Sequence, residues 1–186
     1  SVSQSCKSLF DKTWPDLKNK SFVVENCINT EEIQRKSAIN TITYPIKPVQ
    51  FVTVARICKE KGFERAINIL SRLKKMGYDF RWHVIGGNGK SIEEQIKSAG
   101  LCSEIILYGE KENPYRFIKN ANAFLLLSYQ EAAPIVIQEA ICLKVPVIST
   151  NTLSAKELVG TNGIILNNDE ESIFNGLKKI LDQPEI

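Results

Sequence analysis

The sequence predicts an α/β fold, a doubly wound domain built on a parallel six-stranded sheet. From residue 49 onward, short apolar or β-branched runs alternate with segments of helical periodicity. The strand-like runs are apolar throughout, which is typical of parallel strands that helices cover on both faces. With 186 residues, 43% of them hydrophobic and 24% charged, the chain can form one such domain with an appendage.

The expected elements follow in order along the chain. Six strands are expected at residues 49–54, 80–86, 104–109, 123–128, 145–150 and 163–166. Helices are expected between and after them, at residues 62–77, 91–100, 113–121, 134–143, 154–159 and 169–183. In the first helix the spacing from Ala66 to Leu73 makes one apolar stripe, and Gly77 can end it. Pro114 suits a first helical turn, and Asn168 or Asp169 can cap the last helix.

The first 44 residues have a different character. They contain a helix-like piece from Ser3 to Phe10, a lone strand at 21–26, and a polar stretch that reaches Pro45 and Pro48. We therefore expect residues 1–44 to be the edge of another unit with a linker, and residues 45–186 to form the main domain. The serine at position 1 suggests a part of a longer protein.

Composition excludes several classes of protein. The net charge of +3 comes from 24 basic and 21 acidic residues that are scattered along the chain, so no nucleic-acid-binding block is present. The five cysteines are widely spaced, without C-x-x-C and with a single histidine, which favours reduced thiols in the cytoplasm over disulfides or zinc. No apolar run approaches the roughly 20 residues of a membrane span, and the first residues lack the apolar core of a signal peptide.

A binding site is expected at the carboxyl edge of the sheet. If the strand order is 3-2-1-4-5-6, the loop after strand 1, "ARICKEKG", lies beside the loop after strand 4, "SYQEAAP". The first loop carries Arg56 and Lys61, and the second leads into a helix that begins at Pro134. Cations that face the N–H groups of a helix start make a site for a phosphate or pyrophosphate.

Two glutamates flank this expected anion site. Glu139 lies five residues into the helix, about 7.5 Å along its axis, while Glu131 precedes the helix by three residues. Catalytic carboxylate pairs act across one bond, so this arrangement instead favours two grips on one elongated ligand, with hydroxyl groups at both ends. A nucleoside diphosphate sugar has that layout. The alternative interpretation is an ordinary loop acid and a partly buried helix acid.

Several segments in register resemble the carboxyl-terminal, donor-binding half of GT-B glycosyltransferases. The segments include "VARICKEKGFERAINILSRL", "HVIGGNG", "IILYGE" and "ANAFLLLSYQEAAPIVIQEAICLKVPVIST", spanning roughly residues 49–183. They resemble in particular the retaining family 4, the glycosyl transferases group 1, which builds bacterial surface polysaccharides on Rossmann-like domains. The family's E-x7-E motif is matched by Glu131 and Glu139, and its Arg and Lys by Arg56 and Lys61.

The resemblance implies roles for these residues. Arg56 and Lys61 would hold the donor diphosphate and stabilise the leaving group, Glu131 would lie at the sugar, and Glu139 would hold the ribose hydroxyls. It also implies further donor contacts, made by Gly86 in the crevice, by Tyr108, Glu110 and Lys111 near the base, and by Ala132, Ala133, Pro134 and Ile135 around sugar and phosphate. No D-x-D motif is present in the sequence, so we expect no metal or cofactor, and His83, the single histidine, lies within an expected strand and is expected to be structural.

Two departures from the family pattern stand out. Ala132 and Ala133 replace a glycine and a larger residue, and Lys144 replaces a glycine, at a cost of about 1–2 kcal/mol if its backbone is left-handed. The resemblance further implies a glycan or lipid-linked acceptor, bound by a preceding domain, and peripheral association with the inner face of the cell membrane. This chain alone would bind donor without turnover. The alternative is a non-catalytic nucleotide-sugar-binding module or one subunit of a split transferase.

Overall fold

The computed structural model describes residues 1–183, so the last three residues of the expected 45–186 domain lie outside the described part. Six parallel strands form one sheet in the order β3-β2-β1-β4-β5-β6, which confirms the predicted fold class and strand order. The strands are β1 (Val49–Val54), β2 (Phe80–Ile85), β3 (Ile105–Leu107), β4 (Ala123–Leu126), β5 (Val147–Thr150) and β6 (Gly163–Leu166).

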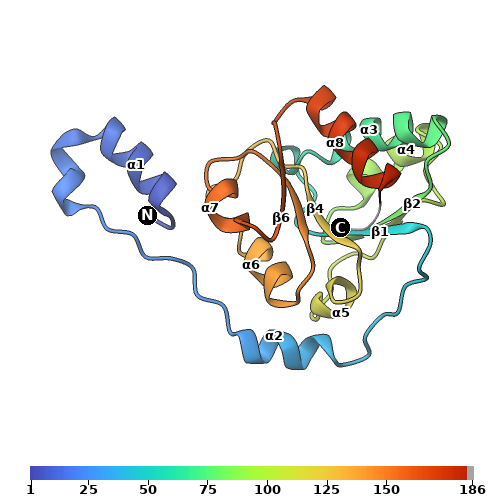
Figure 1. Cartoon of the computed structure of the whole chain (residues 1–186), viewed down its shortest axis with the longest axis horizontal. Coiled ribbons are helices and arrows are strands. Elements are labelled where there is room, and N and C mark those ends of the chain that lie inside the picture. The colour runs from blue at the N-terminus through green and yellow to red at the C-terminus, as the bar shows by residue number, and fades with distance from the viewer. Residues whose placement is uncertain (184–186) are drawn as a thin grey trace.

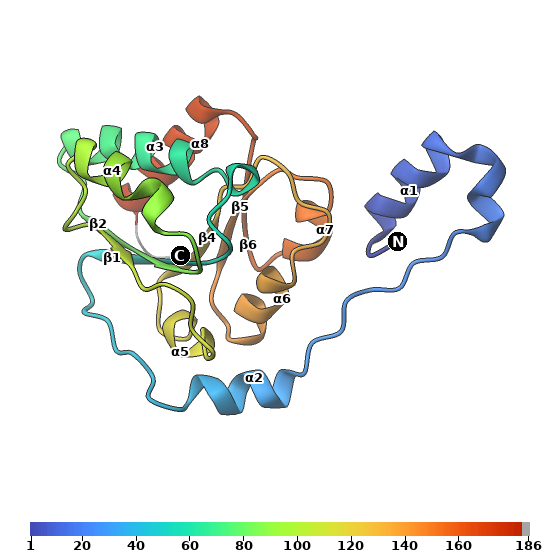
Figure 2. The same cartoon turned by 180° about the vertical axis from the view of Figure 1, so that it is seen from behind.

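Helices cover both faces of the sheet, as the apolar strands require. One layer contains α3 (Phe63–Lys75), α4 (Lys90–Ser98) and α8 (Glu170–Asp182) (Figure 1). The other contains α2 (Thr30–Ser37), α5 (Tyr115–Ile118), α6 (Ile135–Cys142) and α7 (Ala155–Val159), and the view from behind shows the same two layers (Figure 2). The sheet therefore separates two apolar cores.

Sequence patterns explain where these helices begin, pack and end. The stripe from Ala66 to Leu73 on α3 is fully buried, and each large side chain in such a position contributes about 1.5–3 kcal/mol. Gly77 follows α3 with a φ of 91°, which suits glycine. Asp169 caps α8, because its carboxylate accepts a hydrogen bond of 2.8 Å from the Ser172 N–H.

The prediction of a lone strand at residues 21–26 is wrong. These residues run as an extended segment between a 3-10 helix, η1 (Pro15–Lys20), and α2, and they pair with no strand of the described chain. Phe22 and Val24 are 72% and 74% exposed. A β-branched run favours a strand only where a neighbouring strand takes its hydrogen bonds and its side chains pack, and none lies here.

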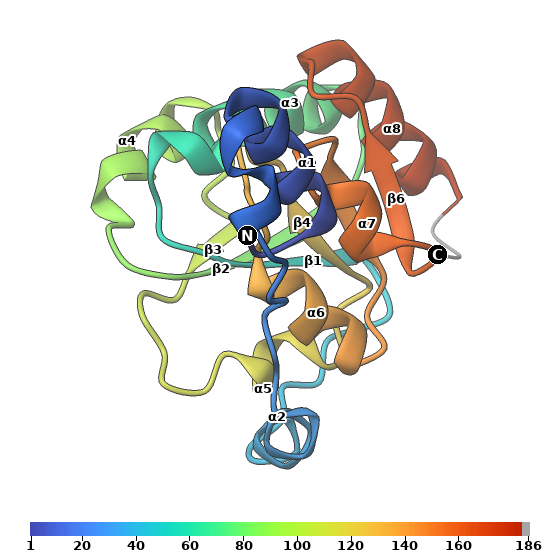
Figure 3. The same ribbon diagram turned by 90° about the vertical axis from the view of Figure 1, so that its left-hand side faces the viewer.

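Two helices near the amino terminus contact the domain in different ways, the first through its amino-terminal end and the second along a buried face. α1 (Gln4–Thr13) is capped by Ser3 and begins beside α7 (Figure 3). The Glu157 carboxylate of α7 accepts hydrogen bonds from the Gln4 and Ser5 N–H groups at 3.0 and 3.1 Å. These bonds lower the pKa of Glu157. α2, which the sequence did not reveal, is capped by Asn29 and buries Ile33 against α5 and α6. The stretch expected to be a linker thus includes a helix of the layer that contains α5, α6 and α7.

Across residues 1–183, no helix is both long and apolar enough to span a membrane.

Candidate functional site

The loops after β1 and β4 meet at the carboxyl edge of the sheet, as the strand order predicts. The Tyr129 N–H donates a hydrogen bond of 2.8 Å to the Glu60 carbonyl. Gly62 has a φ of 67°, and a Cβ there would lie 2.3 Å from the Leu127 carbonyl oxygen. Only glycine allows this approach without strain, so "KG" after β1 is required for the two loops to touch.

Arg65 on α3, which is not among the site residues predicted from the sequence, holds this junction together. Its guanidinium donates to the Leu127 carbonyl at 2.6 Å and to Asn168 Oδ1 at 2.9 Å, and it lies over the Tyr129 ring at 3.9 Å. The residue is 2% exposed, and burial lowers its pKa. The helical spacing could have indicated this burial, because Arg65 precedes Ile69 by four residues and so shares the buried face of α3.

Lys61 and Glu131 form an ion pair across the two loops. Lys61 Nζ lies 2.5 Å from Glu131 Oε1, and the side chains are only 20% and 10% exposed. Ser128 Oγ donates to the same carboxylate oxygen at 2.7 Å. Glu131 is therefore held in one orientation with its charge balanced, as a group must be to position part of a ligand.

A pocket of about 700 Å³ opens beside Glu131, at the ends of β4 and β5. One wall is Leu9 from α1, so the amino-terminal helix borders the site. The pocket is lined by Leu9, Glu60, Tyr129, Gln130, Glu131, Ala132, Asn151, Thr152 and Leu153.

The start of α6 is open to a ligand. Pro134 occupies the cap position, and no side chain caps the helix within the described residues. The carbonyl of Ala132 accepts from the Cys6 thiol at 3.6 Å, and that of Ala133 accepts from Asn26 Nδ2 at 3.1 Å. These carbonyls are engaged by the amino-terminal segment. The Ile137 N–H donates to the Pro134 carbonyl at 3.2 Å, which leaves the Ile135 and Val136 N–H groups of the first turn to face an anion.

Glu139 lies in a second, smaller pocket of about 260 Å³ under α2. Its Oε1 accepts a hydrogen bond of 3.0 Å from the Tyr115 hydroxyl. Burial raises the pKa of Glu139, and the Tyr115 hydrogen bond opposes part of that rise. The two glutamates therefore line different pockets, and residues 132–135 lie between them along the chain.

The remaining predicted residues occupy the loops after β1, β2 and β3. Arg56 is exposed directly after β1. Gly86 allows the loop after β2 to pack on that after β1, because a Cβ there would lie 1.9 Å from the Ala55 carbonyl oxygen. Glu110 and Lys111 are exposed after β3, and the Glu110 carboxylate lies beside Gly87.

Tyr108 is turned into the protein. Its hydroxyl lies 3.0 Å from His83 Nδ1, and its ring packs against Phe117 with centroids 4.6 Å apart. His83 is buried, its Nε2 meets Gln50 Oε1 at 2.8 Å, and burial lowers its pKa to about 4. Both ring nitrogens of the single histidine thus have partners within the fold, in agreement with the structural role expected of it.

The described part of the chain contains no group of three or more His, Cys, Asp or Glu side chains that could hold a metal ion. All five cysteines are free thiols.

Comparison with known proteins points in one direction. The glycosyl transferases group 1 family matches residues 31–186. A relative from Campylobacter jejuni, an N-acetylgalactosamine-N,N'-diacetylbacillosaminyl-diphospho-undecaprenol 4-alpha-N-acetylgalactosaminyltransferase, is 30% identical over 174 residues, 90% of this chain and 46% of its own length. An O-antigen biosynthesis glycosyltransferase, WbnH of Escherichia coli, is 31% identical over 132 residues, 71% of this chain and 37% of its own.

Solved structures show the same fold. Anabaena Alr3699/HepE, in complex with UDP, superposes on all of this chain with a TM-score of 0.79 at 17% identity, and the match covers 54% of that protein. The neighbours are GT-B glycosyltransferases. The chain spans less than half the length of the curated relatives it matches. Because the family match covers most of its residues, the chain belongs to the glycosyl transferases group 1 family.

Proposed function

We propose that this chain is the donor-binding part of a retaining glycosyltransferase. The intact protein would transfer a sugar from a nucleoside diphosphate sugar to a glycan or lipid-linked acceptor in surface polysaccharide synthesis. One observation carries the proposal: the ion-paired Lys61 and Glu131 lie beside the open start of α6, where strand order reverses, in a chain of this family.

The arrangement suits a diphosphate leaving group. Negative charge develops on the diphosphate as the bond from sugar to phosphate breaks, and preset cations and N–H groups stabilise such charge most effectively. Arg56, Lys61 and the first turn of α6 supply these groups at the carboxyl edge of the sheet. Glu131, held by Lys61 and Ser128, would orient the sugar, and no metal is required in this scheme.

The relatives support the proposed substrates. The name of the Campylobacter relative describes a transferase that acts on a diphospho-undecaprenol compound, and that of the Escherichia relative refers to O-antigen biosynthesis. The Anabaena structure holds UDP. In the proposal a preceding acceptor domain joins through residues 1–44, and the five free thiols suit a cytoplasmic protein that meets its acceptor at the inner face of the membrane.

Titration calorimetry with UDP, GDP and ADP, and then with their sugars, tests the proposal. We expect one of the three nucleotides to bind and Arg56→Ala to weaken its binding about 10–100-fold, because a hydrogen bond to a charged group contributes about 1.5–3 kcal/mol. Lys59→Ala is the matched control, since Lys59 is an exposed cation of the same loop that is not assigned to the donor. Absence of binding by all three nucleotides would overturn the proposal.

A further inference from the structure

The pocket around Glu139 contains a carboxylate that is not paired with the cation lining the same pocket. Its walls come from three elements, α6, α5 and the segment 27–36 that contains α2. The pocket is lined by Cys27, Ile28, Asn29, Glu32, Ile33, Lys36, Tyr115, Ile135 and Glu139. Its one cation, Lys36, pairs with Glu32 at 2.7 Å. Within residues 1–183, Glu139 has no ion pair, and its hydrogen-bond partner is the Tyr115 hydroxyl.

Tyr115 is itself firmly placed. It begins α5, two residues after Asn113. Asn113 Nδ2 donates to the Lys36 carbonyl at 2.8 Å and so joins this turn to the end of α2. Burial raises the pKa of Tyr115 to about 12, so its hydroxyl stays protonated and can act only as a donor toward an ionised carboxylate. The hydroxyl takes one acceptor position on Oε1 of Glu139.

We propose that Tyr115 is a positioning residue: it orients the Glu139 carboxylate so that its remaining acceptor positions receive a pair of hydroxyl groups on the ligand, in a pocket that α2 closes. This inference rests on the proposed function, in which that pair is the 2′,3′-diol of the donor ribose. An ionised carboxylate offers about four acceptor positions, and Tyr115 uses one. A carboxylate with one oxygen held at 3.0 Å loses less freedom when it binds a diol.

The groups that face Glu139 determine how it titrates. They are Tyr115 on α5, Glu32 and Lys36 on α2, Cys142 on α6, and Cys27 at the pocket wall. Burial raises the pKa of Glu139 and the Tyr115 hydroxyl lowers it. Since a diol binds the ionised carboxylate, binding weakens as the pH falls through this pKa. Loss of the hydroxyl raises the pKa and moves that weakening to a higher pH.

The decisive experiment combines a residue change with a ligand change. Tyr115→Phe is titrated with whichever of UDP, GDP and ADP binds the wild-type chain, and with the 2′-deoxy form of the same nucleotide, between pH 5 and 8. We expect a loss of about 3–10-fold for the ribonucleotide, a loss within about twofold for the deoxynucleotide, and weakening that begins at a higher pH. On a Glu139→Gln background, Tyr115→Phe should cause no further loss.

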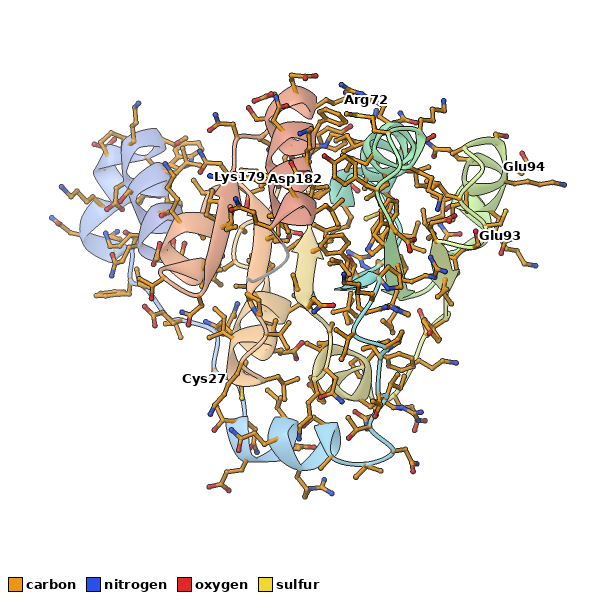
Figure 4. The ribbon with its side chains drawn as sticks, turned by 45° about the vertical axis from the view of Figure 1, so that its right-hand side comes forward. Cys27, Arg72, Glu93, Glu94, Lys179 and Asp182 are labelled. Atoms are coloured by element: carbon orange, nitrogen blue, oxygen red, sulfur yellow. The ribbon has the colours of Figure 1, made fainter. Side chains whose placement is uncertain are left out.

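Tyr78→Phe is the matched control. The Tyr78 hydroxyl donates to Asp182 Oδ1 at 2.6 Å, another contact from tyrosine to carboxylate, but at the end of α8. Figure 4 shows Asp182 in the upper helical layer and Cys27 beside α2 in the lower part of the molecule. This variant should bind both nucleotides like the wild type.

The outcomes separate the inference from the function on which it rests. An equal loss for both nucleotides with an unmoved pH dependence would show that Tyr115 only packs, and would overturn the inference while the donor site stands. Failure of the wild type to bind any of the three nucleotides would overturn the proposed function and the diol assignment together. Titration of the Glu139 carboxyl by NMR checks the pKa directly, and an unchanged pKa in Tyr115→Phe would also refute the positioning role.

Discussion

Glu131 and Glu139 are both glutamates, eight positions apart, yet their carboxylates lie in different electrostatic environments. The Glu131 carboxylate is paired with Lys61 at 2.5 Å and receives a second hydrogen bond from Ser128. The Glu139 carboxylate has a tyrosine hydroxyl at 3.0 Å and lies in a small pocket that raises its pKa. One end of the site is therefore electrostatically balanced, and the other is held by burial and a neutral donor.

This difference shows that a sequence motif does not specify the electrostatic environment of its residues. A carboxylate that is paired with a cation is fixed in one orientation, which suits the role in orienting the sugar that we propose for Glu131. A buried carboxylate without a cation gains most when ligand hydroxyls replace lost water. Each of four substitutions removes a contact at either the Glu131 end or the Glu139 end of the site and leaves the other end intact.

The largest effect is expected from Arg65→Met, which weakens the support of the Glu131 end. The change leaves the Leu127 carbonyl and the Asn168 side chain without their buried donor, at a cost of about 3 kcal/mol in the free energy of unfolding. Urea denaturation measures it. Arg72→Met is the control on the same helix (Figure 4). Arg72 has an exposed partner, Glu171, and its guanidinium also lies over the Phe174 ring. This control change should cost less than about 1 kcal/mol, and equal losses would contradict the assigned role of Arg65.

The next effect is expected from Lys61→Ala, measured as donor nucleotide affinity by calorimetry. Removal of the cation both loses a diphosphate contact and leaves the Glu131 charge unbalanced beside the anion site. We expect about 30–100-fold weaker binding. Adding Glu131→Gln to this variant should restore part of the loss, because it removes the unbalanced charge. No recovery in the double variant would mean that the ion pair does not couple to the anion site.

Glu139→Gln tests the other end through its pH dependence. We expect about tenfold weaker nucleotide binding at pH 8, because an amide accepts fewer hydroxyl hydrogen bonds than a carboxylate. Burial raises the pKa of Glu139 above its ordinary value, so wild-type affinity should fall as the pH drops through that pKa. The Gln variant should lack this fall. A pH dependence that survives the substitution would assign it to another group.

The smallest effect is expected from Lys36→Met, at the mouth of the Glu139 pocket. Lys36 and Glu32 form an i,i+4 ion pair on the exposed side of α2, and such pairs contribute about 0.3–0.5 kcal/mol. The free energy of unfolding should change by less than about 1 kcal/mol, and the difference from wild type should shrink in 1 M salt. A larger loss would indicate that α2 depends on this pair rather than on buried Ile33.

Local patterns in the chain were enough for the parallel sheet and most helices, while the strand order was assumed and the structure confirmed it. Short apolar runs that alternate with helical segments favour buried parallel strands, and the stripe on α3 indicates which face it buries. Lys144 also behaves as the family pattern implied, with a left-handed φ of 59° at the end of α6. The charged residues expected after β1 and β4 meet because parallel topology brings those loops together.

Contacts between distant residues decided the rest. Asn29 and the Glu32–Lys36 pair are local signs of a helix at residues 30–37, but only the packing of Ile33 against α5 and α6 makes this polar helix part of the domain. Residues 21–26 lack the neighbour that would make them a strand. The partner of Glu139 is Tyr115, 24 positions away, and that of Glu131 is Lys61, 70 positions away. Residue type and spacing can indicate that two carboxylates belong to a site. Whether each is balanced by a cation, by a hydroxyl or by burial depends on which elements the fold packs against them, because electrostatic interactions act through space and not along the chain.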